Sequence, residues 1–198
     1  MQDAGAQLVG AVADPKPGQR ILDACAGLGG KTTHLAELAG DAATVIDAAD
    51  LSQTKLGLLR DTITRLGLRS IATHHCDLSL SAAERTSPHK ALPGPYDLVV
   101  LDAPCSGLGV LRRHPDAKWR LTPGDVPRLA ALQRDLLDAV VARLAPAGAL
   151  VYSVCTFTAA EGPAQVRALA ERTGLRIVAE HHTWPPDADA FYIARLER

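Results

Sequence analysis

The sequence predicts an α/β fold in which a mostly parallel β-sheet is covered by helices on both faces. Two observations carry this prediction. Apolar runs typical of strands alternate with helical patterns from end to end, and 198 residues suffice for one large domain with a well-buried core. The sequence contains no internal repeat and no internal domain boundary, so we expect a single Rossmann-like domain.

The expected strands and helices follow one another regularly along the chain. Strand-like runs occupy residues 20–24, 44–49, 70–76, 96–102, 149–155, 176–182 and 191–196, and helical patterns occupy 31–39, 52–66, 124–144 and 160–173. Only the loop 183–190 joins the last two strands. We expect this pair to be antiparallel, because parallel neighbours need a long crossover. Segment 79–95, with three prolines, is predicted to be a loop, and 107–123 a long loop of a kind that is often functional.

Composition excludes several classes of protein. The chain has 21 Lys and Arg against 22 Asp and Glu, so any contact with nucleic acid must come from a local basic patch. No apolar run approaches the roughly 20 residues that span a bilayer, and no signal peptide opens the chain, so we expect a cytoplasmic protein without membrane association. The four cysteines form no CxxC pair, so we expect no metal site.

The first strand runs into a glycine-rich turn, Asp23-Ala24-Cys25-Ala26-Gly27-Leu28-Gly29-Gly30-Lys31-Thr32-Thr33, just before a helix. Glycines at such a turn let the backbone approach a ligand closely. A dinucleotide fingerprint would need glycine at Thr32, and a Walker A loop would need glycine at Cys25, so neither motif fits. The remaining interpretation is a loop that binds S-adenosylmethionine.

Acidic residues at the ends of successive strands favour the same cofactor. Asp50 ends the second strand and is placed to accept both ribose hydroxyls, better than Asp47, which lies within the strand. Asp77 follows the third strand and is placed to bind the adenine amino group. A single acid in such a position is more often a helix cap, but Asp23, Asp50 and Asp77 occupy three successive strand ends.

Two further strands deliver cysteines to the same edge of the sheet. The fourth strand ends in Asp102-Ala103-Pro104-Cys105, and the fifth ends in Val154-Cys155. A thiolate that adds to carbon 6 of cytosine makes carbon 5 nucleophilic enough to attack a methyl sulfonium, and an acid such as Asp102 at ring nitrogen 3 stabilises the adduct. A second cysteine or a water can then remove the proton from carbon 5. The residues alone do not decide which cysteine attacks.

Three segments carry a resemblance to a known family. They are Asp102-Ala103-Pro104-Cys105-Ser106-Gly107, then Arg112-Arg113-His114-Pro115-Asp116-Ala117-Lys118-Trp119, then Tyr152-Ser153-Val154-Cys155-Thr156. In this order they resemble the Sun/RsmB-like RNA (cytosine-5)-methyltransferases over nearly the whole chain. The resemblance implies a seven-stranded class I methyltransferase fold with an antiparallel last strand.

The resemblance also implies roles for individual residues. It assigns the nucleophile to Cys155, proton removal and product release to Cys105, and contact with the target nucleotide to Lys31 and Asp102. The substrate it implies is RNA, with small-subunit (16S) ribosomal RNA expected. The expected cofactor-binding residues are Asp23, Cys25, Ala26, Gly27, Leu28, Gly29, Gly30, Lys31, Asp50, Lys55, Asp77 and Asp102.

The chain departs from the family pattern at several positions. The glycine loop lacks the usual proline, and Gly27 compensates for this loss if it adopts unusual dihedrals. Near Cys155, Val154 replaces a usual threonine and Gly162 replaces a usual asparagine. The resemblance identifies residues 1–198 as the catalytic domain, with the family's N-terminal RNA-binding domains absent. The local basic cluster expected to contact RNA comprises Arg112, Arg113, His114 and Lys118, with Arg120 beside them. Trp119 in this cluster is equally compatible with base stacking and with inward packing.

Two alternative functions follow from these features. The altered residues and the absent N-terminal region are compatible with a catalytically weak, cofactor-binding scaffold associated with RNA. DNA cytosine methylation with Cys105 as nucleophile is disfavoured, because Ser106 follows Cys105 in place of the usual glutamine. The sequence makes no prediction of oligomeric state.

Overall fold

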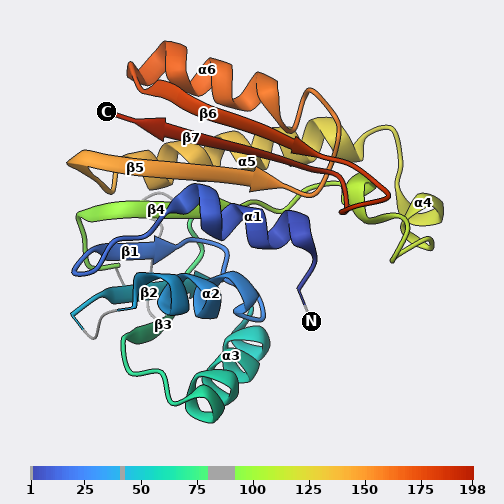
Figure 1. Cartoon of the computed structure of the whole chain (residues 1–198). Coiled ribbons are helices and arrows are strands. Elements are labelled where there is room, and N and C mark those ends of the chain that lie inside the picture. Colours follow the sequence, from blue (N-terminus) through green and yellow to red (C-terminus); the bar gives the residue numbers. More distant parts are fainter. Residues whose placement is uncertain (1, 41–42, 80–91) are drawn as a thin grey trace.

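The computed structural model describes residues 2–40, 43–79 and 92–198. Its strands are β1 (Arg20–Asp23), β2 (Val45–Asp50), β3 (Ile71–His75), β4 (Tyr96–Asp102), β5 (Leu144–Val154), β6 (Arg176–Thr183) and β7 (Phe191–Glu197). They form one seven-stranded sheet in the order β3-β2-β1-β4-β5-β7-β6 (Figure 1). The predicted α/β architecture is confirmed.

Strand direction also agrees with expectation. The pairs β2–β3, β1–β2, β1–β4 and β4–β5 are parallel, whereas β7 runs antiparallel to both β5 and β6. The strand order reverses between β1 and β4, since β2 and β3 lie on one side of β1 and β5 on the far side of β4. Ligands of open α/β sheets bind at such a reversal, beyond the carboxyl ends of the strands.

Helices cover both faces of the sheet (Figure 1). The helices are α1 (Ala4–Ala13), α2 (Gly30–Ala39), α3 (Gln53–Leu66), α4 (Ala117–Arg120), α5 (Asp125–Val141) and α6 (Pro163–Thr173), with a short 3-10 helix at Leu108–Val110. On one face, α1 and α2 pack on Ile21, Ile46 and Val151, and α3 packs beside them on Ala48. On the opposite face lie α5 and α6, while α4 lies out to the side near the β6–β7 turn.

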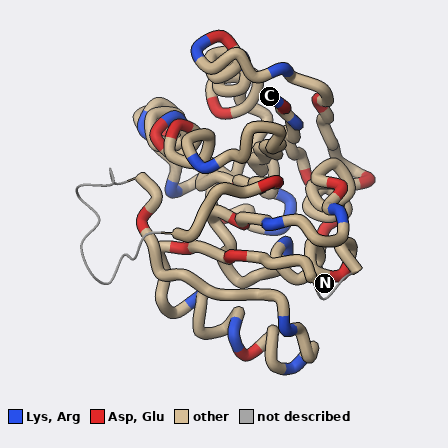
Figure 2. Tube along the Cα trace, turned by 90° about the vertical axis from the view of Figure 1, so that its left-hand side faces the viewer, with Lys and Arg blue, Asp and Glu red and all other residues tan. Residues whose placement is uncertain are grey.

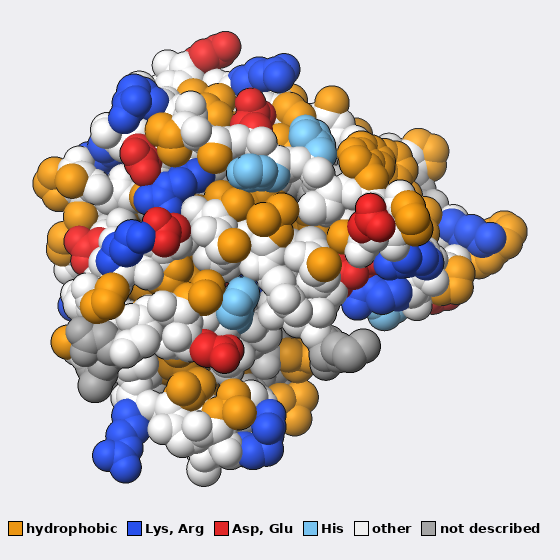
Figure 3. Space-filling model, in the orientation of Figure 1, with side chains coloured by type: hydrophobic (Ala, Val, Ile, Leu, Met, Phe, Trp, Pro, Cys, Tyr) orange, Lys and Arg blue, Asp and Glu red, His pale blue; other side chains and the backbone are white. Residues whose placement is uncertain are grey.

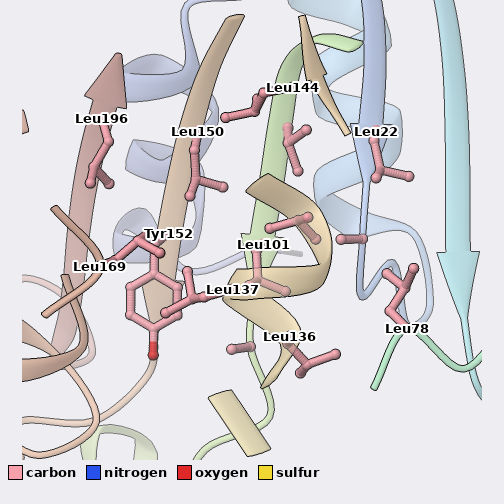
Figure 4. Close-up of a cluster of buried hydrophobic side chains, with 14 of the residues drawn as sticks. Leu22, Leu78, Leu101, Leu136, Leu137, Leu144, Leu150, Tyr152, Leu169 and Leu196 are labelled. Atoms are coloured by element: carbon pink, nitrogen blue, oxygen red, sulfur yellow. The ribbon is translucent and has the colours of Figure 1, made fainter. Parts of the chain in front are cut away.

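The larger core lies between the central strands and the helices α5 and α6. In Figure 4, Leu137 of α5 and Leu169 of α6 lie close to Leu150 and Tyr152 of β5, and all four side chains are fully buried. The buried hydroxyl of Tyr152 donates a hydrogen bond of 2.6 Å to the carbonyl oxygen of Glu161. Apolar burial of this kind stabilises by about 25 cal/mol per Å² and fixes the ends of β4 and β5 against one another.

Several element boundaries differ from the sequence predictions. Helix α1 was not predicted; its N-cap Asp3 accepts a hydrogen bond from the Gly5 amide, and Val9 is fully buried. The helix expected over 124–144 ends at Val141, because β5 begins at Leu144 and pairs with Tyr96. The 107–123 loop contains the 3-10 turn and α4. The loop predicted over 79–95 falls mostly outside the described residues.

Among the described residues, none of the helices combines the length and apolarity that crossing a membrane requires.

Candidate active site

The turn after β1 is shaped by two glycines in left-handed conformations. Gly27 has φ +55° and Gly29 has φ +85°, a region that side chains other than glycine rarely adopt. A Cβ on Gly29 would lie 2.1 Å from Cδ1 of Leu59, so this glycine also permits close packing of the turn on α3. The Gly27 amide donates a 2.8 Å hydrogen bond to Oδ2 of Asp50, which joins the turn to the end of β2. Gly27 thus adopts the unusual dihedrals that the sequence analysis considered for it.

A pocket of about 640 Å³ lies at the strand-order reversal, beyond the ends of β1, β2 and β4. The predicted cofactor residues that line it are Cys25, Ala26, Gly27, Leu28, Gly30, Lys31, Asp50, Lys55 and Asp102. The pocket also has walls that the sequence prediction missed: Gln2, Ala6, Leu51, Ser52, Ala103 and Pro104. Gln2 and Ala6 belong to the N-terminal segment around α1, whose part in the pocket no sequence motif indicated.

Three predicted cofactor residues do not belong to this lining. Gly29 lies beneath the turn as the N-cap of α2. Asp23 is buried and accepts a 2.6 Å hydrogen bond from the Thr32 hydroxyl, so it braces the start of α2. Asp77 follows β3, and its Oδ1 accepts hydrogen bonds from the amide and hydroxyl of Ser79 at 2.9 and 2.6 Å. Residues 80–91, which follow Ser79, are not described, so the pocket lining given above refers only to the described residues.

Burial changes the acid–base behaviour of the turn. It raises the pKa of Asp23 to about 6, although the Thr32 hydrogen bond and the charge of Lys31 oppose the change. One carboxylate oxygen of Asp23, Oδ1, is buried without a hydrogen-bond partner among the described residues. Burial, followed by the nearby Asp23 carboxylate, raises the pKa of the Cys25 thiol far above its ordinary range, so Cys25 is an unreactive thiol in the pocket wall.

Lys31 and Asp102 form an ion pair in the lining of the pocket. The Lys31 ammonium lies 2.6 Å from Oδ2 of Asp102, and the Ser153 hydroxyl donates to Oδ1 of the same carboxylate at 2.8 Å. Burial opposes the positive charge of Lys31, but the Asp102 carboxylate outweighs it, so the pKa of Lys31 is raised. Lys31 also lies over the ring of Phe191, 5.7 Å from its centroid. The ammonium group is therefore held charged in the wall of the pocket.

The two strand-end cysteines meet, as their positions predicted. The Sγ atoms of Cys105 and Cys155 are 3.3 Å apart, within hydrogen-bond distance for sulfur, and both are free thiols. The hydrogen bond from Cys105 lowers the pKa of Cys155, burial opposes this, and the positive charge of Lys31 assists it. The same hydrogen bond and burial raise the pKa of Cys105 well above its ordinary range. The opposite directions of the two pKa changes favour Cys155 as the thiol that ionises first.

A buried carboxylate that the sequence analysis did not single out fixes the loops that carry both cysteines. Glu161 is fully buried. Its Oε1 accepts from the Ser106 amide at 2.7 Å and from Nε2 of Gln133 at 3.2 Å, and its Oε2 accepts from the hydroxyls of Ser106 and Thr158 at 2.6 and 2.8 Å. The Ser106 and Thr156 hydroxyls are also 3.0 Å apart. Hydrogen bonds therefore connect residues next to each cysteine with Glu161, either directly or through Ser106.

The two substitutions beside this anchor fit their surroundings. Val154 is fully buried in the core under α6. At Gly162 a Cβ would approach the Tyr192 ring to 3.0 Å, tighter than normal packing, so this fold favours glycine there. Neither substitution removes a group from the cysteine pair.

The predicted basic cluster is exposed throughout, and two of its arginines also pair with a buried carboxylate. Arg112 and Arg113 both pair with the buried carboxylate of Asp189, and Nη1 of Arg112 donates to the Pro186 carbonyl at 2.9 Å. His114 is exposed, and the Lys118 ammonium lies 4.9 Å from the centroid of the Trp119 ring. Trp119 is 82% exposed, so it does not pack inward. Over the described chain, Lys and Arg are interspersed with Asp and Glu (Figure 2), as the nearly balanced composition leads one to expect.

Comparisons with known proteins identify the family and the fold. A family model described as 16S rRNA methyltransferase RsmB/F matches residues 11–197. Ribosomal RNA small subunit methyltransferase B of Vibrio cholerae is 38% identical over 100% of this chain and 46% of its own length. A Synechocystis protein described as a probable ribosomal RNA small subunit methyltransferase B is 41% identical over 93% of this chain and 38% of its own length. The crystal structure of NSun6 from Pyrococcus horikoshii with SFG, an S-adenosylmethionine analogue, superposes with a TM-score of 0.84 at 27% identity, over 99% of this chain and 52% of that one.

The fold is that of the Rossmann-like S-adenosylmethionine-dependent methyltransferases, and the pocket lies at the strand-order reversal, where such sheets bind ligands. The lining suits that cofactor, because it combines glycine backbone, the Asp50 carboxylate and apolar Leu51 and Ala103 for a molecule with charged, ribose and adenine parts. More narrowly, the chain belongs to the RsmB/F family of 16S rRNA methyltransferases. It spans less than half the length of the two curated relatives.

Proposed function

We propose that this chain transfers the methyl group of S-adenosylmethionine to carbon 5 of a cytosine in RNA, with small-subunit (16S) ribosomal RNA as the substrate. The observation that carries the proposal is the Cys105–Cys155 contact of 3.3 Å beside the Lys31–Asp102 pair. One thiol primed as a thiolate and a second thiol beside it suit a reaction with one nucleophilic step and one proton removal. Such a substrate implies a cytoplasmic location.

Each residue has a role in the proposed reaction. The Cys155 thiolate adds to carbon 6 of the ring, and the electrons of the ring double bond make carbon 5 nucleophilic. Asp102 contacts the ring at nitrogen 3 and passes to it a proton from the Lys31 ammonium, 2.6 Å away, which neutralises the charge developed on addition. Bound S-adenosylmethionine would supply an electrophilic methyl group to carbon 5, with its neutral thioether as the leaving group.

Cys105 then acts on the product side. Its pKa is raised chiefly by donating to Cys155. Once the sulfur of Cys155 is bonded to carbon, that sulfur is neutral and a poor acceptor, so the main cause of the raised pKa is removed. Cys105 then passes its own proton to water and, as a thiolate, accepts the proton from carbon 5. The ring double bond re-forms as the carbon–sulfur bond breaks and the Cys155 thiolate is released, and nitrogen 3 returns its proton to the Lys31–Asp102 pair.

An adduct assay tests this proposal. Small-subunit ribosomal RNA containing 5-fluorocytosine traps the adduct because fluorine on carbon 5 does not leave as a proton does. We expect a covalent protein–RNA species with the unchanged chain and none with Cys155→Ala. With unmodified RNA, Cys105→Ala is expected to accumulate the adduct, because proton removal is then slow.

Two controls accompany the assay. Cys76→Ala removes a buried thiol outside the pair and is expected to form adduct normally. Calorimetric titration with S-adenosylmethionine shows that each variant still binds cofactor. Full methyl transfer by Cys155→Ala would refute the mechanism. Cofactor binding without any trapped adduct in the unchanged chain would favour the scaffold function instead.

A further inference from the structure

Two large aromatic side chains are exposed near the strand end that carries Cys155. Phe157 lies two residues after Cys155 and is 51% exposed, and Trp184, directly after β6, is 54% exposed. Their rings stack, with centroids 6.2 Å apart and planes inclined by 30°. The exposed His182 ring lies nearly parallel to Trp184, inclined by 7° at 6.5 Å. We call Phe157, His182 and Trp184 the aromatic shelf.

The shelf is fixed to the strand end that carries Cys155. The Gly109 amide donates to the Cys155 carbonyl at 2.9 Å, and the Ala190 amide donates to the Gly109 carbonyl at 3.0 Å. A Cβ on Gly109 would lie 1.9 Å from the Ala190 carbonyl oxygen and 2.8 Å from that of Cys155, so only glycine permits this contact. The β6–β7 loop, which begins at Trp184, is thereby held against the end of β5.

Cationic groups border the shelf. Arg112 and Arg113 reach the same loop through Asp189, and each side chain stays almost half exposed after pairing. A guanidinium carries five N–H donors, so the exposed sides of both arginines can donate to phosphate oxygens. In Figure 3, hydrophobic side chains and Lys and Arg side chains gather together at the right-hand edge of the molecule, where Figure 1 shows α4 and the β6–β7 turn.

We propose that the aromatic shelf stacks an unpaired base of the RNA strand next to the target cytosine; this inference rests on the proposed function. A cytosine that reaches Cys155 must leave its stack, and its neighbour then loses a stacking partner. Exposed aromatic rings restore that stacking for any base, since every base has a π-face. The half-exposed arginines beside the shelf match the phosphates on either side of such a base. The occupant is therefore single-stranded RNA and not a duplex.

Tryptophan fluorescence gives a direct test. The chain has two tryptophans, so Trp119→Phe leaves Trp184 as the reporter within the shelf. We expect a short oligocytidylate to quench this fluorescence on binding, and a duplex RNA of the same length not to do so. Stacking is worth about 1–3 kcal/mol per base, so Trp184→Ala is expected to weaken oligocytidylate binding about 5- to 150-fold in a filter assay. Phe157→Ala weakens it in the same direction.

Matched variants separate stacking from folding. Leu58→Ala removes a comparably exposed apolar side chain on α3, at the opposite end of the molecule in Figure 1, and is expected to leave binding unchanged. Trp184→Phe keeps a stacking ring and is expected to bind more tightly than Trp184→Leu. Single nucleotides of the oligocytidylate are then replaced by abasic residues, one position at a time. At one position of the strand, this replacement is expected to reduce the loss of binding affinity that Trp184→Ala causes.

The outcomes are independent of catalysis. Equal quenching by duplex and single strand, equal affinity of Trp184→Ala and the unchanged chain, or no binding of oligocytidylate would overturn the shelf, even if methyl transfer proceeds. Quenching that depends on Trp184 supports the shelf even if no adduct forms, in which case the proposed reaction alone is refuted.

Discussion

Replacing Glu161 tests whether one buried carboxylate holds the two cysteine loops together. Glu161→Ala removes the acceptor of four hydrogen bonds. Two of the donors keep a second partner: the Ser106 hydroxyl lies 3.0 Å from that of Thr156, and Nε2 of Gln133 donates to the Pro104 carbonyl at 2.8 Å. The Thr158 hydroxyl can turn towards solvent. The buried Ser106 amide is the group left without an acceptor.

The magnitude follows from these contacts. An unsatisfied buried donor costs about 1–3 kcal/mol, and the cavity left by the side chain adds to it, so we expect Glu161→Ala to lower the free energy of unfolding by about 2–5 kcal/mol. Glu161→Gln keeps Oε1 as acceptor, and the two hydroxyls facing its amide can rotate to accept. Only the charge assistance of the hydrogen bonds is lost, so a decrease of about 1 kcal/mol is expected.

Two measurements decide the outcome. Urea denaturation gives the free energies of unfolding. Alkylation by iodoacetamide, resolved by peptide mass, is expected to label Cys105 faster in Glu161→Ala, because the segment from Pro104 to Ser106 has lost its anchor. Glu171→Ala, an exposed acid on α6, serves as control and is expected to change stability by less than about 0.5 kcal/mol. The reasoning is refuted if Glu161→Ala is as stable as the unchanged chain, or if Glu161→Gln is as damaging as Glu161→Ala.

Two predictions concern pH. Iodoacetamide reacts with the thiolate of Cys155, and the pKa of this thiol lies below the ordinary 9.0 because Cys105 donates to it and Lys31 is positive. Lys31→Met is therefore expected to move the midpoint of the alkylation profile to higher pH, whereas the control Lys118→Met leaves it in place. A midpoint that stays fixed in Lys31→Met would contradict the role of the Lys31 charge. Burial raises the pKa of Asp23 from 3.8 to about 6, so its contribution to stability is present at low pH and lost as pH rises through about 6. In urea denaturation, the free energy of unfolding of Asp23→Asn is therefore expected to rise by up to about 3 kcal/mol relative to that of the unchanged chain as the pH goes from about 4 to about 7. A difference independent of pH would show that Asp23 keeps an ordinary pKa.

Much of the fold could be predicted because its signals are local. The strand predicted over 96–102 coincides with β4, and the remaining strands other than β5 agree within a residue at each end. β5 begins earlier than predicted because its first residues pair with Tyr96 around Gly148, where a Cβ would lie 2.9 Å from the Tyr96 carbonyl oxygen. The segment 144–148 looks like a turn in sequence, and only its tertiary partner makes it part of the sheet.

The candidate site also combines features that could be predicted from the sequence with features that depend on tertiary contacts. The meeting of Cys105 and Cys155 follows from strand order, since neighbouring parallel strands end at the same edge of the sheet. The burial of Glu161 could not be predicted, because it depends on segments 28 to 55 residues away in the chain. The pairing of Arg113 with Asp189 joins residues separated by 76 positions, and no local pattern indicates it. Contact of these arginines with RNA stays a prediction.

The position of β7 has a consequence for synthesis of the chain. β7 lies between β5 and β6 and pairs with both, whereas these two strands are not neighbours in the sheet. As the ribosome makes the protein, β5 therefore has an open edge until residues 191–197 have emerged, although most of the core residues are already present. Phe191, which lies under Lys31, arrives with the same segment. Closing the exposed strand edge and completing the wall beside Lys31 thus become a single late folding event, and until then the nascent chain carries the unpaired edge that makes β-proteins prone to aggregate.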